Sequence, residues 1–139
     1  MARILIVDDH LDQCRPLVRL LKLHGHEAAC VGGGLEALAW LGTVTAQGSP
    51  DLVICDVMMP DLDGSEVLRR IRRGEAGSAG VPVVMHTAVG DVAFHEHLRT
   101  LGADDVWVKT RVGVDQILQY VARYDERNRS GSSEVAGAL

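Results

Sequence analysis

The sequence predicts an α/β fold in which a parallel five-stranded sheet lies between two layers of helices. Short apolar runs rich in β-branched residues alternate with amphipathic segments, and this alternation occurs five times along the chain. Apolar runs without polar residues are typical of strands that helices cover on both faces. We therefore expect a doubly wound (βα)5 three-layer sandwich with right-handed crossovers and, as the working sheet order, 2-1-3-4-5.

The first strand and helix set the N-terminal part of this pattern. The apolar run from Arg3 to Val7 predicts a strand, and Glu27 to Val31 predicts the second strand. Pro16 is harmless only in the first turn of a helix, so we expect Asp12 to cap the helix between these strands and Gly25 to end it.

Three consecutive glycines, residues 32–34, precede the second helix. They complete neither of the glycine motifs that cradle phosphates, so a cofactor site is not expected there. Apolar residues between Leu35 and Leu41 have helical spacing and predict the helix, and Thr43 to Pro50 predicts a polar loop.

The third strand, Leu52 to Asp56, is the most informative stretch. Four apolar residues end at a carboxylate, and Pro60 and Gly64 then turn the chain into a third helix. Asp56 is thus expected at the carboxyl end of a strand, the edge where open α/β sheets bind ligands. Taken alone, the stretch also fits an aspartate with only a turn-forming role.

The last two units follow the same rules. Pro82 is tolerated near the start of a strand, where the loss of one ladder donor matters least. We expect a strand over Val81 to His86 ending at Thr87, a helix over Asp91 to Leu101, a strand over Asp104 to Val108 ending at Lys109, and a helix over Val114 to Tyr124.

Length and composition fit one domain of 139 residues with 47% hydrophobic and 24% charged residues. Residues 1–126 should form the domain, and the Ser-, Gly- and Ala-rich residues 127–139 a flexible tail. No apolar run approaches a membrane span and no signal-peptide core is present, so a cytoplasmic location is expected. The net charge of −5 argues against a nucleic-acid surface.

Cysteine and arginine positions give two further expectations. Three cysteines are an odd number in a chain without secretory marks, so no disulfide framework is expected, and Cys30 and Cys55 should be small buried apolar residues. The arginines at 69, 70, 72 and 73 lie where a helix should end and would complement its dipole; a contact patch for an acidic partner is the alternative.

Polar side chains follow four of the five apolar runs and should meet at one edge of the sheet. With the order 2-1-3-4-5, Asp8, Asp9 and Asp56 share a crevice. Two carboxylates about 5 Å apart repel by roughly 3 kcal/mol at an effective dielectric constant near 20, so a divalent cation is expected. Oxygen ligands with room for water favour Mg²⁺.

The same edge holds Thr87 and Lys109. A carboxylate beside a metal, with a hydroxyl and an ammonium group nearby, can act as a nucleophile toward phosphorus. Mg²⁺ and Lys109 would offset the charge on the transferred group, and Thr87 would donate a hydrogen bond to the product.

These motifs together resemble the receiver domain of two-component response regulators, a flavodoxin-like fold. The resemblance covers about residues 2–125 and rests on five separated motifs in the right order: Asp8-Asp9, Asp56 with Met59-Pro60 and Asp63-Gly64, Thr87-Ala88, Gly102-Ala103-Asp104, and Lys109.

The resemblance implies that Asp56 is phosphorylated by a partner histidine kinase or phosphotransfer protein. Asp9, Asp56 and the backbone carbonyl of Met58 would bind Mg²⁺ directly, with Asp8 acting mostly through water. Thr87 and Lys109 would sense the phosphoryl group. The surface of the last two helices and the strand between them would respond and is a candidate homodimer face. The domain would catalyse only its own phosphoryl acceptance and slow autodephosphorylation.

Two departures from the family pattern affect this transfer. The family usually follows its lysine with a cis proline, but Thr110 stands there, so the Lys109–Thr110 bond is expected to be either trans or strained. Val106 occupies the place of the switch aromatic; the adjacent Trp107 faces the opposite side of the strand and should be mostly core. Output coupling should therefore differ from aromatic rotation.

Autodephosphorylation and two rival classes complete the expectations. The residues two past Asp56 and two past Thr87 are the apolar Met58 and Val89, which predicts slow loss of the phosphoryl group. A metal-dependent phosphatase would need a second acid where Met58 stands. A phosphorylation-independent receiver-like interaction module is the second rival. The kinase, the downstream target and the effector domain are left open.

Overall fold

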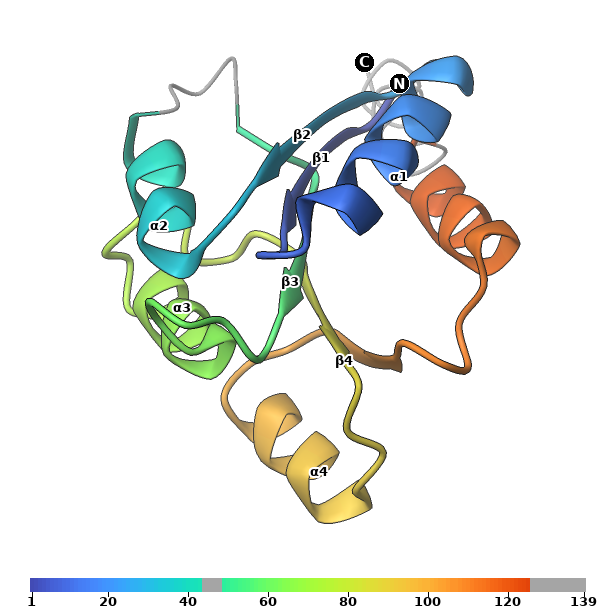
Figure 1. Cartoon of the computed structure of the whole chain (residues 1–139). Helices are drawn as coiled ribbons and strands as arrows, with labels where there is room; N and C mark the ends of the chain where they lie inside the picture. The colour runs from blue at the N-terminus through green and yellow to red at the C-terminus, as the bar shows by residue number, and fades with distance from the viewer. Residues whose placement is uncertain (44–48, 126–139) are drawn as a thin grey trace, which may run out of the picture.

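The computed structural model describes residues 1–43 and 49–125. It contains a parallel five-stranded sheet in the order β2-β1-β3-β4-β5 (Figure 1). The strands are β1 (Arg3–Val7), β2 (Glu27–Val31), β3 (Leu52–Asp56), β4 (Val83–Thr87) and β5 (Asp105–Val108). The helices are α1 (Leu11–Leu23), α2 (Gly34–Thr43), α3 (Gly64–Arg72) and α4 (Val92–Thr100), and residues 114–125 are also helical. The doubly wound flavodoxin-like fold and its strand order are thereby confirmed.

The apolar side chains of the strands divide into two separate clusters, one on each face of the sheet. One contains Leu5, Val53 and Met85 and lies on the face covered by α2, α3 and α4. The other contains Ile54 and Trp107 and lies on the face covered by α1 and the 114–125 helix (Figure 1). Successive strand residues enter opposite clusters, as the period of two requires. Both faces of the sheet are therefore buried.

The strand register aligns the carboxyl ends of the strands that carry the polar residues. Val7 pairs with Cys55, so the residues that follow β1 lie beside Asp56. Asp56 in turn pairs with His86, and Thr87 with Val108. The expected convergence of polar residues at one sheet edge follows directly from this register.

Helix α1 begins earlier than the sequence predicts. His10 is its N-cap residue, with no capping bond from its side chain, and the expected cap, Asp12, lies in the first turn. Pro16 consequently lies inside the helix rather than at its start. Asp12 and Pro16 are both exposed, so water can bond the Asp12 carbonyl that the proline leaves without a donor.

The expectation of unpaired cysteines is wrong for two of the three. Cys14 in α1 and Cys30 in β2 form a disulfide, with their Cα atoms 6.3 Å apart. An odd cysteine count cannot reveal this pair, because the proximity arises only when α1 packs beside β2. Cys55 is free and buried, as expected.

Two of the three glycines, Gly33 and Gly34, have a structural role at the start of α2. The backbone N–H groups of Gly34 and Leu35 donate to the Asp61 carboxylate at 3.1 and 3.0 Å, which lowers the pKa of Asp61. A Cβ atom at Gly33 would lie 2.6 Å from an Asp61 oxygen. A side chain at Gly33 would therefore displace the carboxylate that caps α2.

The remaining boundaries differ only slightly from expectation. β4 begins at Val83 and β5 at Asp105, and Asp91 caps α4 by accepting a hydrogen bond from the Ala93 N–H at 3.0 Å. The expected flexible tail at 127–139 and the centre of the expected polar loop, residues 44–48, lie outside the described residues.

Candidate functional site

Three aspartates from the ends of two neighbouring strands lie together, as the sequence predicts. Asp8 and Asp9 follow β1, and Asp56 ends β3. One oxygen from each aspartate and one ring nitrogen of His10 all lie within 4.8 Å of one another. Asp8 and Asp56 are only 7% and 5% exposed. The cluster therefore concentrates negative charge where water cannot screen it well.

Lys109 reaches this cluster from the end of β5. Its Nζ atom lies 3.3 Å from Asp8 Oδ2 and 3.2 Å from Asp56 Oδ2. Burial tends to lower the pKa of Lys109, but the carboxylates of Asp56 and Asp8 outweigh it, so this pKa is raised. The lysine is thus held in its charged form between the two acids.

One lysine does not fully compensate the aspartates. Burial raises the pKa of Asp56, with a further contribution from the charge of Asp8, against the opposing effects of Lys109 and of a hydrogen bond from the Met58 backbone. The ionised Asp56 carboxylate is therefore less stable in the folded protein than in water. Additional positive charge at this position would stabilise it.

Asp9 supplies an oxygen suited to such a charge. Its Oδ1 atom is shielded from solvent and accepts no hydrogen bond from the described residues. The His10 ring lies beside it, with Nδ1 3.3 Å away. A buried carboxylate oxygen without a donor is costly unless a cation binds it. With Asp8 and Asp56 alongside, the oxygen donors fit Mg²⁺.

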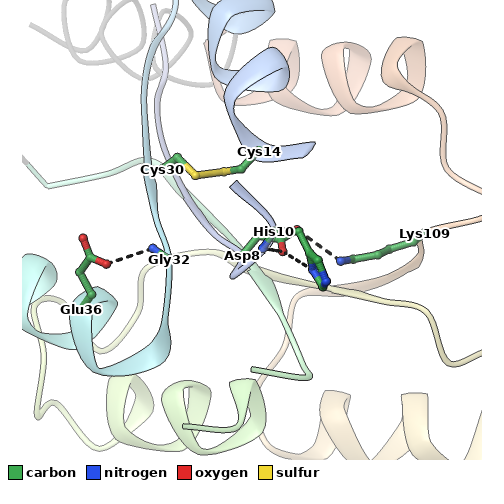
Figure 2. The surroundings of a disulfide bond; sticks show 7 residues. All are labelled: Asp8, His10, Cys14, Cys30, Gly32, Glu36 and Lys109. Atoms are coloured by element: carbon green, nitrogen blue, oxygen red, sulfur yellow. Dashed lines mark hydrogen bonds and ion pairs between the residues drawn. A yellow bond between two sulfur atoms is a disulfide. The ribbon is translucent and has the colours of Figure 1, made fainter. Parts of the chain in front are cut away.

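His10 is a member of the site that sequence reasoning missed. Its backbone N–H donates to Asp8 Oδ1 at 2.9 Å, and its ring Nδ1 lies 3.2 Å from the same oxygen (Figure 2). Its position directly after Asp9 was the only signal in the sequence. The ring is 59% exposed and lies at the edge of the cluster, so it can orient Asp8 without closing the site.

Thr87 lies at the end of β4, fully buried beside Lys109 in the sheet. The Lys109 backbone N–H donates to the Thr87 carbonyl at 2.7 Å. The Thr87 hydroxyl oxygen accepts a hydrogen bond from the Val89 N–H at 3.1 Å. These bonds fix the two backbones that follow β4 and β5 relative to each other.

The loop after β3 is folded tightly against Asp56. The Gly64 N–H donates to the Val57 carbonyl at 2.7 Å, and Asp63 caps α3 by accepting from the Ser65 N–H at 2.8 Å. A Cβ atom at Gly64 would overlap the Asp56 carbonyl oxygen. Met58, two residues after Asp56, is in contrast 68% exposed, so its side chain is largely in contact with solvent.

The two departures from the family pattern have clear structural outcomes. No cis peptide bond occurs among the described residues, so the Lys109–Thr110 bond is trans, and Lys109 still reaches both acids. Val106 and Trp107 are 8% and 7% exposed and belong to the two different apolar clusters. Trp107 is therefore core, as expected, and does not occupy the position of Val106.

The arginines of α3 are occupied within the domain. Arg69, Arg70 and Arg73 each pair with Glu66. Arg72 binds the carbonyls of Ala79, Val81 and Gly102 and pairs with Asp104 at 3.0 Å. Arg72 thus ties α3 to its surroundings, which is more than the helix-dipole role predicted from the sequence.

A sheet of this order with an acidic cluster, a threonine and a lysine at its carboxyl edge is the arrangement of a two-component receiver domain. The family described as "Response regulator receiver domain" matches residues 4–122. The chain belongs to this family, and it is the receiver domain of a two-component response regulator.

Curated relatives agree with this assignment. The chain is 40% identical over 107 residues to the probable transcriptional regulator ycf27 of Cyanophora paradoxa, covering 77% of this chain and 41% of the relative. It is 34% identical over 137 residues to the DNA-binding response regulator MtrA of Mycobacterium tuberculosis, covering 99% of this chain and 55% of the relative. The chain thus spans about half the length of the curated relatives it matches, or less.

Solved structures share the fold. The receiver domain of the Francisella response regulator 1452 superposes with a TM-score of 0.80 at 23% identity, covering 92% of this chain and 99% of that one. The receiver domain of a signal transduction histidine kinase from Syntrophus aciditrophicus superposes with a TM-score of 0.75 at 30% identity, covering 89% of each chain.

None of the helices in the described part of the chain has both the length and the apolar composition needed to cross a bilayer.

Proposed function

We propose that Asp56 accepts a phosphoryl group from a partner histidine kinase or phosphotransfer protein. The observation that carries the proposal is the environment of this carboxylate. It is buried, only partly compensated, within the acidic cluster, and 3.2 Å from Lys109. A carboxylate in this setting can act as a nucleophile once its charge and that of the incoming group are balanced.

The acidic cluster is the site for Mg²⁺ in this proposal. Asp9, Asp56 and the backbone carbonyl of Met58 would hold the ion, with Asp8 acting mostly through water. The unsatisfied Asp9 Oδ1 and the all-oxygen carboxylate set support this assignment. When bound, the ion would offset negative charge on the phosphoryl oxygens and orient them.

Phosphoryl transfer then needs few steps from the chain itself. A carboxylate oxygen of Asp56 attacks phosphorus, and the P–N bond to the donor's imidazole breaks. The bonding electron pair leaves with the imidazole nitrogen, which takes up a proton. Lys109 would move its contact from Asp56 to the transferred oxygens, and the Thr87 hydroxyl would donate a hydrogen bond to one of them.

The output of this event is carried by the face that α4, β5 and the 114–125 helix form. Replacing the Lys109–Asp56 ion pair by contacts to a phosphoryl group changes charge at the end of β5, which supports a response on this face. We also propose that this face mediates homodimer contact, that the domain works in the cytoplasm, and that it binds neither nucleic acid nor membrane. Turnover would be limited to its own phosphoryl acceptance and slow loss.

The decisive experiment is intact-mass measurement after incubation with acetyl phosphate and Mg²⁺. The wild type should gain the mass of one phosphoryl group, and chelation of Mg²⁺ should prevent it. Asp56→Asn should gain none, while replacement of the exposed Asp115 by Asn should leave the gain intact. An unmodified wild type would support the phosphorylation-independent module instead. Phosphotransfer profiling against purified kinases would then name the donor.

A further inference from the structure

The Cys14–Cys30 disulfide lies beside the acidic cluster and has no part in the proposed phosphoryl chemistry. Cys14 belongs to the first turn of α1, and Cys30 is the residue before the last one of β2. Figure 2 shows the bond between the start of α1 and β2, with Asp8 and His10 in the loop that leads into α1. The bond therefore links α1 and β2, the two elements to which the acidic loop, residues 8–10, is hydrogen-bonded.

We propose that Cys14 and Cys30 form a reversible thiol–disulfide exchange site whose redox state sets how firmly the acidic loop is held. The effect on Mg²⁺ and phosphoryl acceptance rests on the proposed function. The exchange itself and its effect on the loop do not.

Two hydrogen bonds connect the disulfide to the acidic loop. The Cys14 N–H donates to the His10 carbonyl at 3.1 Å, which fixes the start of α1. The Asp8 N–H donates to the carbonyl of Val31, the neighbour of Cys30, at 3.1 Å. The His10 end of the segment from Asp8 to His10 is thus bonded to Cys14 itself, and the Asp8 end to the neighbour of Cys30. Breaking the disulfide removes the covalent link between α1 and β2, so these two hydrogen bonds and the packing of α1 on the sheet are left to hold the segment.

His10 extends this link to the carboxylates. Its backbone and ring bond Asp8, and its ring nitrogen also lies 3.3 Å from Asp9 Oδ1. A shift of the first turn of α1 would carry His10 with it, because His10 is the residue from which the helix starts. Asp8 Oδ1 would then lose its bonds to His10, and Asp9 Oδ1 would lose the ring nitrogen that lies beside it.

Cys14 and Cys30 differ in exposure, and this difference decides which of the two sulfur atoms a small thiol attacks. Cys14 is 2% exposed, whereas Cys30 is partly exposed. The thiolate of a low-molecular-weight thiol therefore attacks the Cys30 sulfur, breaks the disulfide and releases Cys14 as a thiolate that takes up a proton. A second small thiol attacks the mixed disulfide, frees Cys30 as a thiol and leaves as a low-molecular-weight disulfide. Two electrons pass from the two small thiols to the protein.

The fold does not require this disulfide for its stability. Apolar clusters fill both faces of the sheet, so the fold has the core that small disulfide-dependent domains lack. In a reducing compartment, disulfides in such domains are typically transient and regulatory. Cys55 does not compete, because burial raises the pKa of its thiol and removes it from solvent.

The test begins with thiol counting by mass after alkylation in glutathione buffers of graded ratio. The wild type should change from three free thiols to one as the buffer becomes oxidising, whereas Cys14→Ser/Cys30→Ser should keep one throughout. Cys55→Ser should change from two to none. A wild type that keeps either thiol count across all buffers contradicts the exchange site.

Amide hydrogen exchange on residues 8–14 then measures the loop directly. We expect at least severalfold faster exchange in the reduced wild type than in the oxidised one, and in the double variant under both conditions. Mg²⁺ titration by calorimetry should show correspondingly weaker binding when the pair is reduced. If neither form binds Mg²⁺ while the amide rates still differ, the proposed function fails and the exchange site stands. Equal amide rates in both forms overturn the proposal.

Discussion

Lys109 Nζ lies 3.2 Å from Asp56 Oδ2, although the peptide bond after the lysine is trans and no proline follows it. The reach of this side chain is set by the end of β5, where the Lys109 N–H is bonded to the Thr87 carbonyl. A proline-fixed loop is therefore not needed to bring the ammonium group to the aspartate in this chain.

The imperfect compensation of Asp56 predicts that Asp56→Asn is more stable than the wild type at pH 7. Burial raises the pKa of Asp56, so the stability that its protonated form contributes is present below the unfolded pKa of about 3.9 and is lost as pH rises through the folded pKa. At pH 7 the substitution removes a poorly compensated buried charge, with an expected gain on the order of 1 kcal/mol.

Urea denaturation at pH 7 and pH 5 measures this gain, which should shrink at the lower pH. Asp61→Asn is the control of opposite sign, because hydrogen bonds from the backbone of α2 lower the pKa of Asp61. That substitution should destabilise the protein at pH 7. A destabilised Asp56→Asn would show that Lys109 compensates the aspartate fully.

His86 predicts a loss of stability in mild acid. Burial and the nearby charge of Lys109 lower the pKa of His86 to about 4, although the charge of Asp8 opposes them. The His86 Nε2 atom accepts no hydrogen bond from the described residues. The stability that the neutral ring contributes is complete above the unfolded pKa of about 6.5. It is lost as pH falls toward 4, by up to about 3 kcal/mol.

The measurement is the free energy of unfolding between pH 7 and pH 4 for the wild type and His86→Leu. Acidification raises the contribution of Asp56 to stability, which opposes the effect of His86. The informative quantity is therefore the difference in the free energy of unfolding between the wild type and His86→Leu at each pH. The variant should lose less stability on acidification. Parallel curves for the two proteins would exclude His86 as the cause.

Gly64 predicts a steric effect next to the site. A Cβ atom there would overlap the Asp56 carbonyl oxygen and lie 2.9 Å from the Val57 Cα, both backbone atoms that cannot rotate away. Gly64→Ala should cost about 2–3 kcal/mol or more and slow phosphorylation from acetyl phosphate. Gly42→Ala is the matched control in α2, with nothing within 4 Å of the added atom and an expected gain of about 0.5–1 kcal/mol. Equal stability of the two variants would contradict this contact.

Arg72 and Arg69 should differ although they lie on one helix. Arg72 binds three backbone carbonyls and Asp104, and its side chain is 22% exposed. Lysine cannot reproduce this fork, so Arg72→Lys should cost about 1–2 kcal/mol in thermal or urea unfolding. Arg69 pairs with Glu66 on the surface at 3.2 Å, and Arg69→Lys should change stability by less than about 0.5 kcal/mol. If Arg72→Lys left the free energy of unfolding unchanged, the hydrogen bonds of Arg72 would make no net contribution to stability.

Autodephosphorylation should be slow because the residues two past Asp56 and two past Thr87 are apolar. Met58 and Val89 are 68% and 37% exposed, and neither side chain can position an attacking water. The decay of the acyl phosphate in Mg²⁺ measures the rate, and loss within seconds would contradict the prediction. Met58→Asn should accelerate the decay severalfold. Val92→Asn, at an equally exposed apolar position in α4, should leave the rate unchanged.

The sequence is sufficient to predict the sheet and the residues at its edge. A polar residue that ends an apolar run marks the carboxyl end of a strand, and in a parallel sheet these ends lie at one edge. Asp8, Asp9 and Asp56 were brought together by strand order alone, and the structure has them together. The presence of Lys109 at the same cluster followed from the same reasoning.

What the sequence did not predict depends on packing between elements. His10 orients Asp8 because α1 begins one residue after it, and Cys14 meets Cys30 because α1 lies beside β2. Arg72 binds carbonyls from two separate segments of the chain, Ala79 and Val81 in one and Gly102 in the other. No local pattern encodes such contacts, since each partner is ordinary in its own sequence neighbourhood.

The position of Trp107 makes its fluorescence an intrinsic probe of the domain. Its indole packs edge-on against the rings of His86 and Tyr120, with centroids 6.1 and 4.9 Å away, and so joins β4, β5 and the 114–125 helix. Any displacement of that helix alters the surroundings of the indole and thus its emission. Trp40, on the other side of the sheet, supplies a background signal from a different layer. Changes in the C-terminal helix can therefore be followed in real time without attaching a dye.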